Sequence, residues 1–193
     1  MAGRICREVR KCDPEVLEMV IEIAVGIARQ RVEGWSIGAL FVVGAEEEVL
    51  KRSKPLILDP LAHYPKEVKD MRDVNVQGTI KELAKLDGAF VISGDGSVLS
   101  ATRYIEASSR NIDLPMGLGS RHMAAASISK ETDAVAVVVS ESDGVVRIFD
   151  NGELVAEIIT GIGDLEMIKP RIKGDYEKIE EKDLNLTMIV KRS

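Results

Sequence analysis

A glycine-rich stretch in the second half of the chain carries the residues best suited to chemistry. Gly117 and Gly119 lead into Ser120, Arg121 and His122, and a helix of small residues follows at once. Glycine lets a backbone approach a ligand closely, and the start of a helix offers free N–H groups with a partial positive charge. Ser120 can cap this helix or contact a phosphate oxygen, Arg121 presents a cationic fork, and His122 can donate a hydrogen bond or carry a proton. The stretch predicts a phosphate site, but it equally fits a plain helix N-terminus with a surface arginine and a packed histidine, because it is neither GxGxxG nor a Walker sequence.

Two carboxylates stand where predicted elements begin or end. Asp87 separates a predicted helix from a predicted strand, and Glu141 closes a valine-rich strand. A carboxylate at such a place can bind a divalent metal or orient a hydroxyl group. Taken singly, Asp87-Gly88 also fits a helix-ending turn, and Glu141 also fits the first position of a hairpin turn.

Tyr104 is one of few aromatic residues in a chain with 4% aromatics, and it closes the second arm of a predicted hairpin. Stacking of a base on an aromatic ring is worth about 1–3 kcal/mol. A tyrosine in such a place is alternatively a core or interface residue.

The elements that must position these residues follow from hydrophobic periodicity and turn chemistry. Asp13-Pro14 starts a helix, and Ser93–Ser97 forms the turn of a hairpin. The predicted helices cover residues 14–33, 74–86 and 120–130. The predicted strands cover residues 37–43, 88–92, 98–102, 134–140 and 145–149, with an edge strand at 186–190. Buried strands combined with hairpins predict an α/β fold with a mixed, twisted central sheet and helices on both faces. We expect residues 1–163 to form one domain and residues 164–193 to be an extension packed on or near it.

Composition bounds the partners. The 193 residues carry a net charge of −6, which argues against broad binding to nucleic acid or to a membrane surface. The stretch at the N-terminus lacks the features of a targeting signal, and no segment has the roughly 18 apolar residues of a membrane span. Cys6 and Cys12 fit neither a zinc site nor a redox motif, so we expect reduced thiols and a cytoplasmic location.

Together these segments resemble the diadenylate cyclase family, whose domain makes cyclic di-AMP from two ATP. That family carries an Asp-Gly-Ala motif and, some thirty residues later, a Gly-Thr-Arg-His-Arg motif before an alanine-rich helix. Here the motifs stand as Asp87-Gly88-Ala89 and as 119–123, Gly-Ser-Arg-His-Met. The resemblance covers about residues 14–160 and includes the valine-rich strand that ends at Ser140-Glu141.

The resemblance implies a role for each matching residue. Asp87 would help to bind a divalent ion, Mn²⁺ or Mg²⁺, and would position the attacking ribose hydroxyl, with Glu141 as a further metal contact. Arg121 and His122 would act as catalytic residues on the triphosphate. The remaining substrate contacts would come from Gly88, Ala89, Tyr104, Ile105, Gly119 and Ser120.

The same resemblance implies an active species of two face-to-face protomers, each holding one ATP. Met123 replaces the second arginine of the motif and removes a cation that would face phosphate, unless Lys130 or Arg103 compensates. The function expected is therefore a diadenylate cyclase, and the alternative is a nucleotide-binding module of the same fold that is catalytically impaired.

Overall fold

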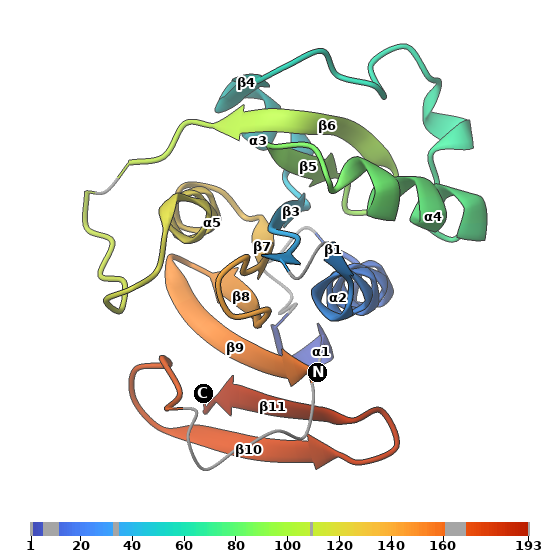
Figure 1. Ribbon diagram of the computed structural model, residues 1–193. Coiled ribbons are helices and arrows are strands. Elements are labelled where there is room, and N and C mark those ends of the chain that lie inside the picture. The colour runs from blue at the N-terminus through green and yellow to red at the C-terminus, as the bar shows by residue number, and fades with distance from the viewer. Residues whose placement is uncertain (1, 6–11, 33–34, 109, 161–168, 193) are drawn as a thin grey trace.

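The computed structural model describes residues 2–5, 12–32, 35–108, 110–160 and 169–192. A nine-stranded sheet runs through the molecule in the order β10-β11-β9-β8-β7-β3-β5-β6-β4 (Figure 1). Its strands are β3 (Ala39–Val43), β4 (Ser53–Pro55), β5 (Ala89–Ile92), β6 (Val98–Ile105), β7 (Val135–Val139), β8 (Val146–Asp150), β9 (Glu153–Thr160), β10 (Tyr176–Glu181) and β11 (Leu186–Lys191). Only β3 and β5 pair in parallel among these neighbours, so the sheet is mixed, as predicted.

Helices cover both faces of the sheet, which confirms the predicted fold class. The helical segments are α1 (Ala2–Ile5), α2 (Pro14–Arg29), α3 (Glu46–Lys51), α4 (Val74–Leu83), α5 (Ser120–Glu131) and the short 3₁₀ turn Lys66–Val68. One apolar core joins α2 and α4 to one face, and a second core joins α3 and α5 to the other (Figure 1). The central strands β3, β5 and β7 are buried at every position because they are covered on both sides.

Asp13 and Asp73 explain why the first long helix and α4 begin where they do. The Asp13 carboxylate accepts a hydrogen bond from the amide of Glu15 at 2.9 Å, and the Asp73 carboxylate accepts one from the amide of Asn75 at 2.8 Å. Such caps satisfy N–H groups that the first turn of a helix leaves free.

The structure corrects the end of the first long helix and the position of the last predicted strand. The helix expected over residues 14–33 ends at Arg29, because Gln30 is extended and Arg31–Val32 (β1) pairs with Trp35–Ser36 (β2). The strand expected at 186–190 exists as β11, but it lies between β9 and β10 and is not an edge. Strand β10 was not predicted, since its sequence Tyr-Glu-Lys-Ile-Glu-Glu is mostly exposed and charged. Pairing of β11 with β9 makes both strands part of the main sheet.

Cys12 contradicts the expectation of two reduced thiols. Its side chain is buried and disulfide-bonded, while Cys6 lies outside the described residues. Two cysteines are too few for a disulfide framework, but one bond needs only Cα atoms within about 7 Å, which sequence spacing does not exclude.

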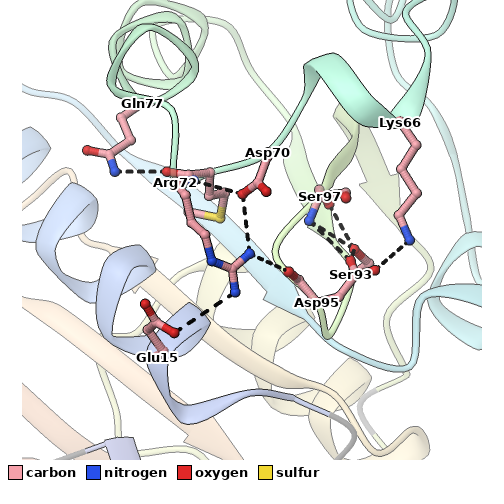
Figure 2. A network of polar contacts seen from close by, with 9 residues as sticks. Glu15, Lys66, Asp70, Arg72, Gln77, Ser93, Asp95 and Ser97 are labelled. Carbon is pink, nitrogen blue, oxygen red and sulfur yellow. Dashed lines mark hydrogen bonds and ion pairs between the residues drawn. The ribbon is translucent and has the colours of Figure 1, made fainter.

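A polar network pins the 93–97 turn at one end of β5 and β6 (Figure 2). Asp95 accepts a hydrogen bond from Lys66 Nζ at 2.7 Å, and its backbone oxygen accepts one from Arg72 Nη1 at 3.0 Å. The hydrogen bonds from Lys66 and then Ser93 lower the pKa of Asp95 to about 2. This network lies at the opposite end of β5 from Asp87. Among the described residues, no helix combines the length and the apolar content that crossing a membrane requires.

Candidate functional site

The candidate site lies at the end of the sheet where the parallel strands β3 and β5 begin. Asp87 and Gly88 immediately precede β5, and Gly38 immediately precedes β3. Strand β7 runs antiparallel to β3, with Val139 opposite Ala39, so Glu141 emerges at the same end. The topology thus gathers residues that are far apart in the sequence.

Arg121, in the first turn of α5, links the two carboxylates. Its Nη2 donates to Asp87 Oδ1 at 3.1 Å, and its Nη1 donates to Glu141 Oε2 at 2.9 Å. The Asp87 side chain is 72% exposed and that of Glu141 is 57% exposed, whereas Arg121 is 31% exposed. The arginine therefore lies deeper than either acid, and both acids keep oxygen atoms open to solvent. The structure brings together all three residues that the sequence singled out for charge.

Gly38 makes room for this arrangement and was not recognised from the sequence as a site residue. A Cβ atom at this position would lie 2.5 Å from Arg121 Nη1 and 3.1 Å from Glu141 Cβ. Any side chain here would displace the guanidinium. The available signal was a glycine inside the apolar run 37–43, which often marks a close approach to a strand.

Gly88 is constrained by its own backbone. Its φ angle is +109°, and a Cβ atom would lie 2.5 Å from the carbonyl carbon of Thr102. Thr102 itself has a φ of 54°, and the pairing of β5 with β6 shifts register along this stretch. Ala89 pairs with Arg103, which places the last residues of β6 beside the Asp87-Gly88 turn.

Tyr104 and Ile105 lie at the end of β6, next to that turn, but they differ in exposure. Tyr104 is 49% exposed, and Lys54 Nζ lies 5.4 Å from the centre of its ring. Ile105 is buried in the core under α3 and α5. Only the tyrosine ring is therefore available to a ligand as a surface.

The N-terminus of α5 opens toward the same end of the sheet. Gly119 is the N-cap residue and makes no side-chain capping bond, so of the two roles that the sequence left open for Ser120, capping the helix is not the one in the structure. The Gly119 carbonyl accepts from the amides of His122 and Met123. In the described part of the chain no acceptor takes the amides of Ser120 or Arg121, which leaves two donors at the positive end of the helix dipole.

His122 does not join Asp87 and Arg121. It is 6% exposed, and its ring packs edge-on against that of Phe149 with 6.1 Å between the ring centroids. Its Nε2 atom lies 3.5 Å from Arg147 Nη1. Burial, and then the nearby Arg147 charge, lower the pKa of His122 to about 4. The packed histidine that the sequence allowed as an alternative is the arrangement in the structure.

Beneath His122 lies a buried ionic network that was not recognised from the sequence. Arg147 and Glu157 are 2% and 3% exposed, and Arg147 Nε donates to Glu157 Oε1 at 3.0 Å. Arg147 Nη2 also donates to Asp143 Oδ2 at 2.7 Å, and the other Glu157 oxygen accepts from the amide of Arg171 at 2.6 Å. Burial raises the pKa of Asp143, but hydrogen bonds from Arg147, Ser140 and the Val145 amide, together with the Arg147 charge, outweigh it and hold that pKa below its ordinary value.

Neither cation suggested as a substitute for an arginine at position 123 lies in the site. Arg103 donates to Ser53 Oγ at 2.8 Å and to the Ser53 carbonyl at 2.7 Å, so it supports β4. Lys130 donates to the Asn111 carbonyl at the far end of α5, about 13 Å along the helix from Arg121 at 1.5 Å per residue. With Met123 in place of an arginine, the groups that the candidate site offers to a phosphate are the Arg121 guanidinium and the amides at the start of α5.

The donor set fits a metal ion that arrives with a ligand better than one held by protein alone. No group of three or more His, Cys, Asp or Glu side chains suited to a metal occurs within the described ranges. Asp87 and Glu141 flank one guanidinium and keep solvent-exposed oxygens. Mg²⁺ is commonly bound by one or two carboxylates together with substrate phosphates, which matches this arrangement.

Comparison with known proteins gives a consistent picture. The model of the family described as DisA bacterial checkpoint controller nucleotide-binding (DAC) matches residues 26–154. A diadenylate cyclase of Methanocaldococcus jannaschii is 48% identical over 141 residues, which is 73% of this chain and 44% of the relative. A diadenylate cyclase of Haloferax volcanii is 43% identical over 148 residues, which is 77% of this chain and 54% of the relative. The chain therefore spans about half the length of these two relatives.

Among solved structures, the chain is similar to one described as a hypothetical membrane spanning protein from Bacillus cereus. The TM-score is 0.54 at 23% sequence identity, with 72% of this chain and 62% of the other covered. This likeness supports the fold.

Proposed function

Because the chain belongs to the DAC family, we propose that it is a diadenylate cyclase, condensing two ATP into cyclic di-AMP with release of two pyrophosphates. One observation carries the proposal: the Arg121 guanidinium lies between Asp87 and Glu141, beside the amides of Ser120 and Arg121, which no acceptor in the described part of the chain takes. A cation and N–H donors suit a triphosphate, and adjacent exposed carboxylates suit the ion that accompanies it.

The reaction needs positioning and charge neutralisation more than covalent catalysis. The 3′-oxygen of one ATP forms a bond to the α-phosphorus of the other, the bond from that phosphorus to pyrophosphate breaks, and the hydroxyl proton leaves to solvent or a carboxylate. The same exchange in the opposite sense closes the ring. Arg121 and the amides of Ser120 and Arg121 would hold phosphate oxygens, and Asp87 would orient the hydroxyl group.

A divalent ion, Mn²⁺ or Mg²⁺, held by Asp87 with Glu141, would offset phosphate charge when bound. Gly88 and Ala89 would line the ribose site, and Tyr104 would offer its exposed ring to the adenine. Ile105, which is buried in the core, would support the adenine site by packing and would not touch the ligand. His122, buried in the first turn of α5 against Phe149 and Arg147, would anchor that turn to the core without touching the triphosphate.

The proposal requires two protomers, because one site holds one ATP and each hydroxyl group must reach the other's α-phosphorus. Turnover per protomer should therefore rise with protein concentration until the pair is formed. A protomer in isolation should bind ATP and release no product.

The second candidate is a nucleotide-binding module of the same fold without the reaction, and Met123 is the observation that favours it. Incubation of the protein with ATP and either Mn²⁺ or Mg²⁺, followed by mass detection of cyclic di-AMP, separates the two. Product at a rate that depends on protein concentration supports the cyclase. ATP that binds and stays intact at every protein concentration supports the impaired module.

A further inference from the structure

A polar cavity beside the C-terminal end of α5 shares none of its described lining residues with the candidate site. Its volume is about 290 Å³, and it opens between the segment that precedes α5, the β8–β9 turn and the chain just before β10. Six charged side chains line it: Lys130, Arg171, Lys173, Lys191, Asp113 and Glu153. Counted over the described residues, four cations against two carboxylates give the lining a charge of +2, in a chain whose net charge is −6.

Among the residues that the structure describes, the pairing of these charges leaves two cations without a carboxylate partner. Lys173 pairs with Asp113, and Lys191 pairs with Glu153. Lys130 Nζ donates to the Asn111 carbonyl at 2.5 Å, and Arg171 Nη1 reaches the Met116 carbonyl at 3.5 Å. No carboxylate of the described chain lies within ion-pair distance of Lys130 or Arg171, so both keep donors for an external anion.

The backbone holds Lys130 in place before any ligand arrives. Gly152 has a φ of +81°, and a Cβ atom there would lie 2.9 Å from Lys130 Cδ, so the lysine stem lies directly on the β8–β9 turn. The Gly152 amide donates to the buried hydroxyl of Ser129 at 3.1 Å, which fixes that turn against α5. A cation held by packing loses less side-chain freedom when it binds an anion.

We propose that this cavity is a second anion site, which takes a small phosphate-bearing ligand between Lys130 and Arg171. Its volume is at the lower limit of small-molecule pockets and suits inorganic phosphate or a small sugar phosphate better than a whole nucleotide. The two outer pairs are exposed at their carboxylates, so an entering anion can compete for Lys173 and Lys191 at little cost. The site stands on its own geometry and holds whether or not the protein turns over ATP.

The test is a titration of the labelled protein, followed by the amide signals of individual residues in ¹H–¹⁵N spectra at constant ionic strength. The background variant Arg121→Ala removes the principal cation of the candidate site at the other end of α5. Inorganic phosphate and ribose 5-phosphate are added in separate arms. We expect saturable shifts at Asn111, Gly152 and Lys173 in both arms, and the tighter arm identifies the source of the phosphate.

The double variant Lys130→Gln/Arg171→Gln should weaken this binding at least about tenfold, the loss expected when charge-assisted hydrogen bonds are removed. Lys85→Gln removes the same kind of charge from the end of the α4 region, where Lys85 pairs with Glu82, and should leave the affinity unchanged. The dispersed spectrum shows in each case that the variant is folded. Shifts that do not saturate, or an affinity equal in the double variant and in Lys85→Gln, would overturn the proposal.

Discussion

The guanidinium of Arg121 lies 3.1 Å from the carboxylate of Asp87, although 34 positions separate the two residues in the chain. Strand β5 brings Asp87 to this end of the sheet, and the first turn of α5 brings Arg121 to the same place. Both side chains are partly exposed, so the pair itself adds only about 0.2–1 kcal/mol to folding. The ion pair matters for position more than for stability, because each side chain holds the other at the place where a ligand would bind.

Replacing Asp87 should abolish turnover without unfolding the protein. Asp87→Ala removes an exposed carboxylate and its ion pair, so the free energy of unfolding should fall by no more than about 1 kcal/mol. Cyclic di-AMP formation from ATP and Mn²⁺ should fall at least about 100-fold, because the group that orients the hydroxyl and contacts the ion is gone. Glu82→Ala removes a similarly exposed acid on α4 and serves as the matched control. Product at the normal rate in Asp87→Ala would refute the assigned role.

Adding one methyl group at Gly38 should lower turnover by displacing Arg121. Gly38→Ala places a carbon 2.5 Å from Arg121 Nη1, so the guanidinium must leave its position between the two acids. We expect at least about a tenfold loss in turnover, since a misplacement of about 1 Å can cost about 100-fold. Product formation and ATP affinity, measured together, check this.

Gly78→Ala provides the control for the previous variant. Gly78 lies within α4, and a Cβ atom there has nothing within 4 Å. Alanine in a helix interior is favoured over glycine by about 0.5–1 kcal/mol, so chemical denaturation should show a more stable protein with normal turnover. If Gly38→Ala and Gly78→Ala lost turnover equally, displacement of the Arg121 guanidinium would not be the cause of the loss.

His122 should make the protein less stable as the solution becomes acidic. Its pKa falls from 6.5 to about 4 on folding, so between these values the unfolded chain binds more protons than the folded one. Stability then rises with pH through this window and is lost as pH falls from about 6.5 toward 4, by up to about 3 kcal/mol. Urea denaturation at a series of pH values measures the slope. His122→Gln should flatten it, whereas His63→Gln, which removes an exposed imidazole, should retain it.

Breaking the buried ion pair should be costly. Arg147→Met leaves the carboxylate of Glu157 buried without its guanidinium partner, and the free energy of unfolding should fall by about 3–5 kcal/mol. The double variant Arg147→Met/Glu157→Leu removes both charges and should recover part of that loss, as measured by denaturation of both proteins. A loss below about 1 kcal/mol in the single variant would contradict this account.

Local signals in the sequence predicted what local chemistry decides. The 93–97 turn, the Asp13 cap and the valine-rich β7 were all predicted, since each depends on residues adjacent in the chain. The meeting of Asp87 with Arg121 was expected from ordered motifs and is present. The inward direction of His122 was not settled, because the same residue fits a ligand or a core until its neighbours are known. Gly38 was not predicted as a site residue because Arg121, the residue that crowds it, is distant in sequence. The Arg147–Glu157 pair was not predicted because it depends on the register of β8 against β9, which sets the two residues opposite each other.

Gly88 sets a limit on what its own motif can reveal. Its positive φ and the Thr102 backbone beside it would exclude any side chain even if no nucleotide ever bound. A descendant of this protein that had lost its chemistry would still retain that glycine simply to close β5 against β6. Folding places no such constraint on Asp87, because its side chain is exposed. After a loss of activity, substitutions would therefore accumulate at Asp87 before they accumulate at Gly88.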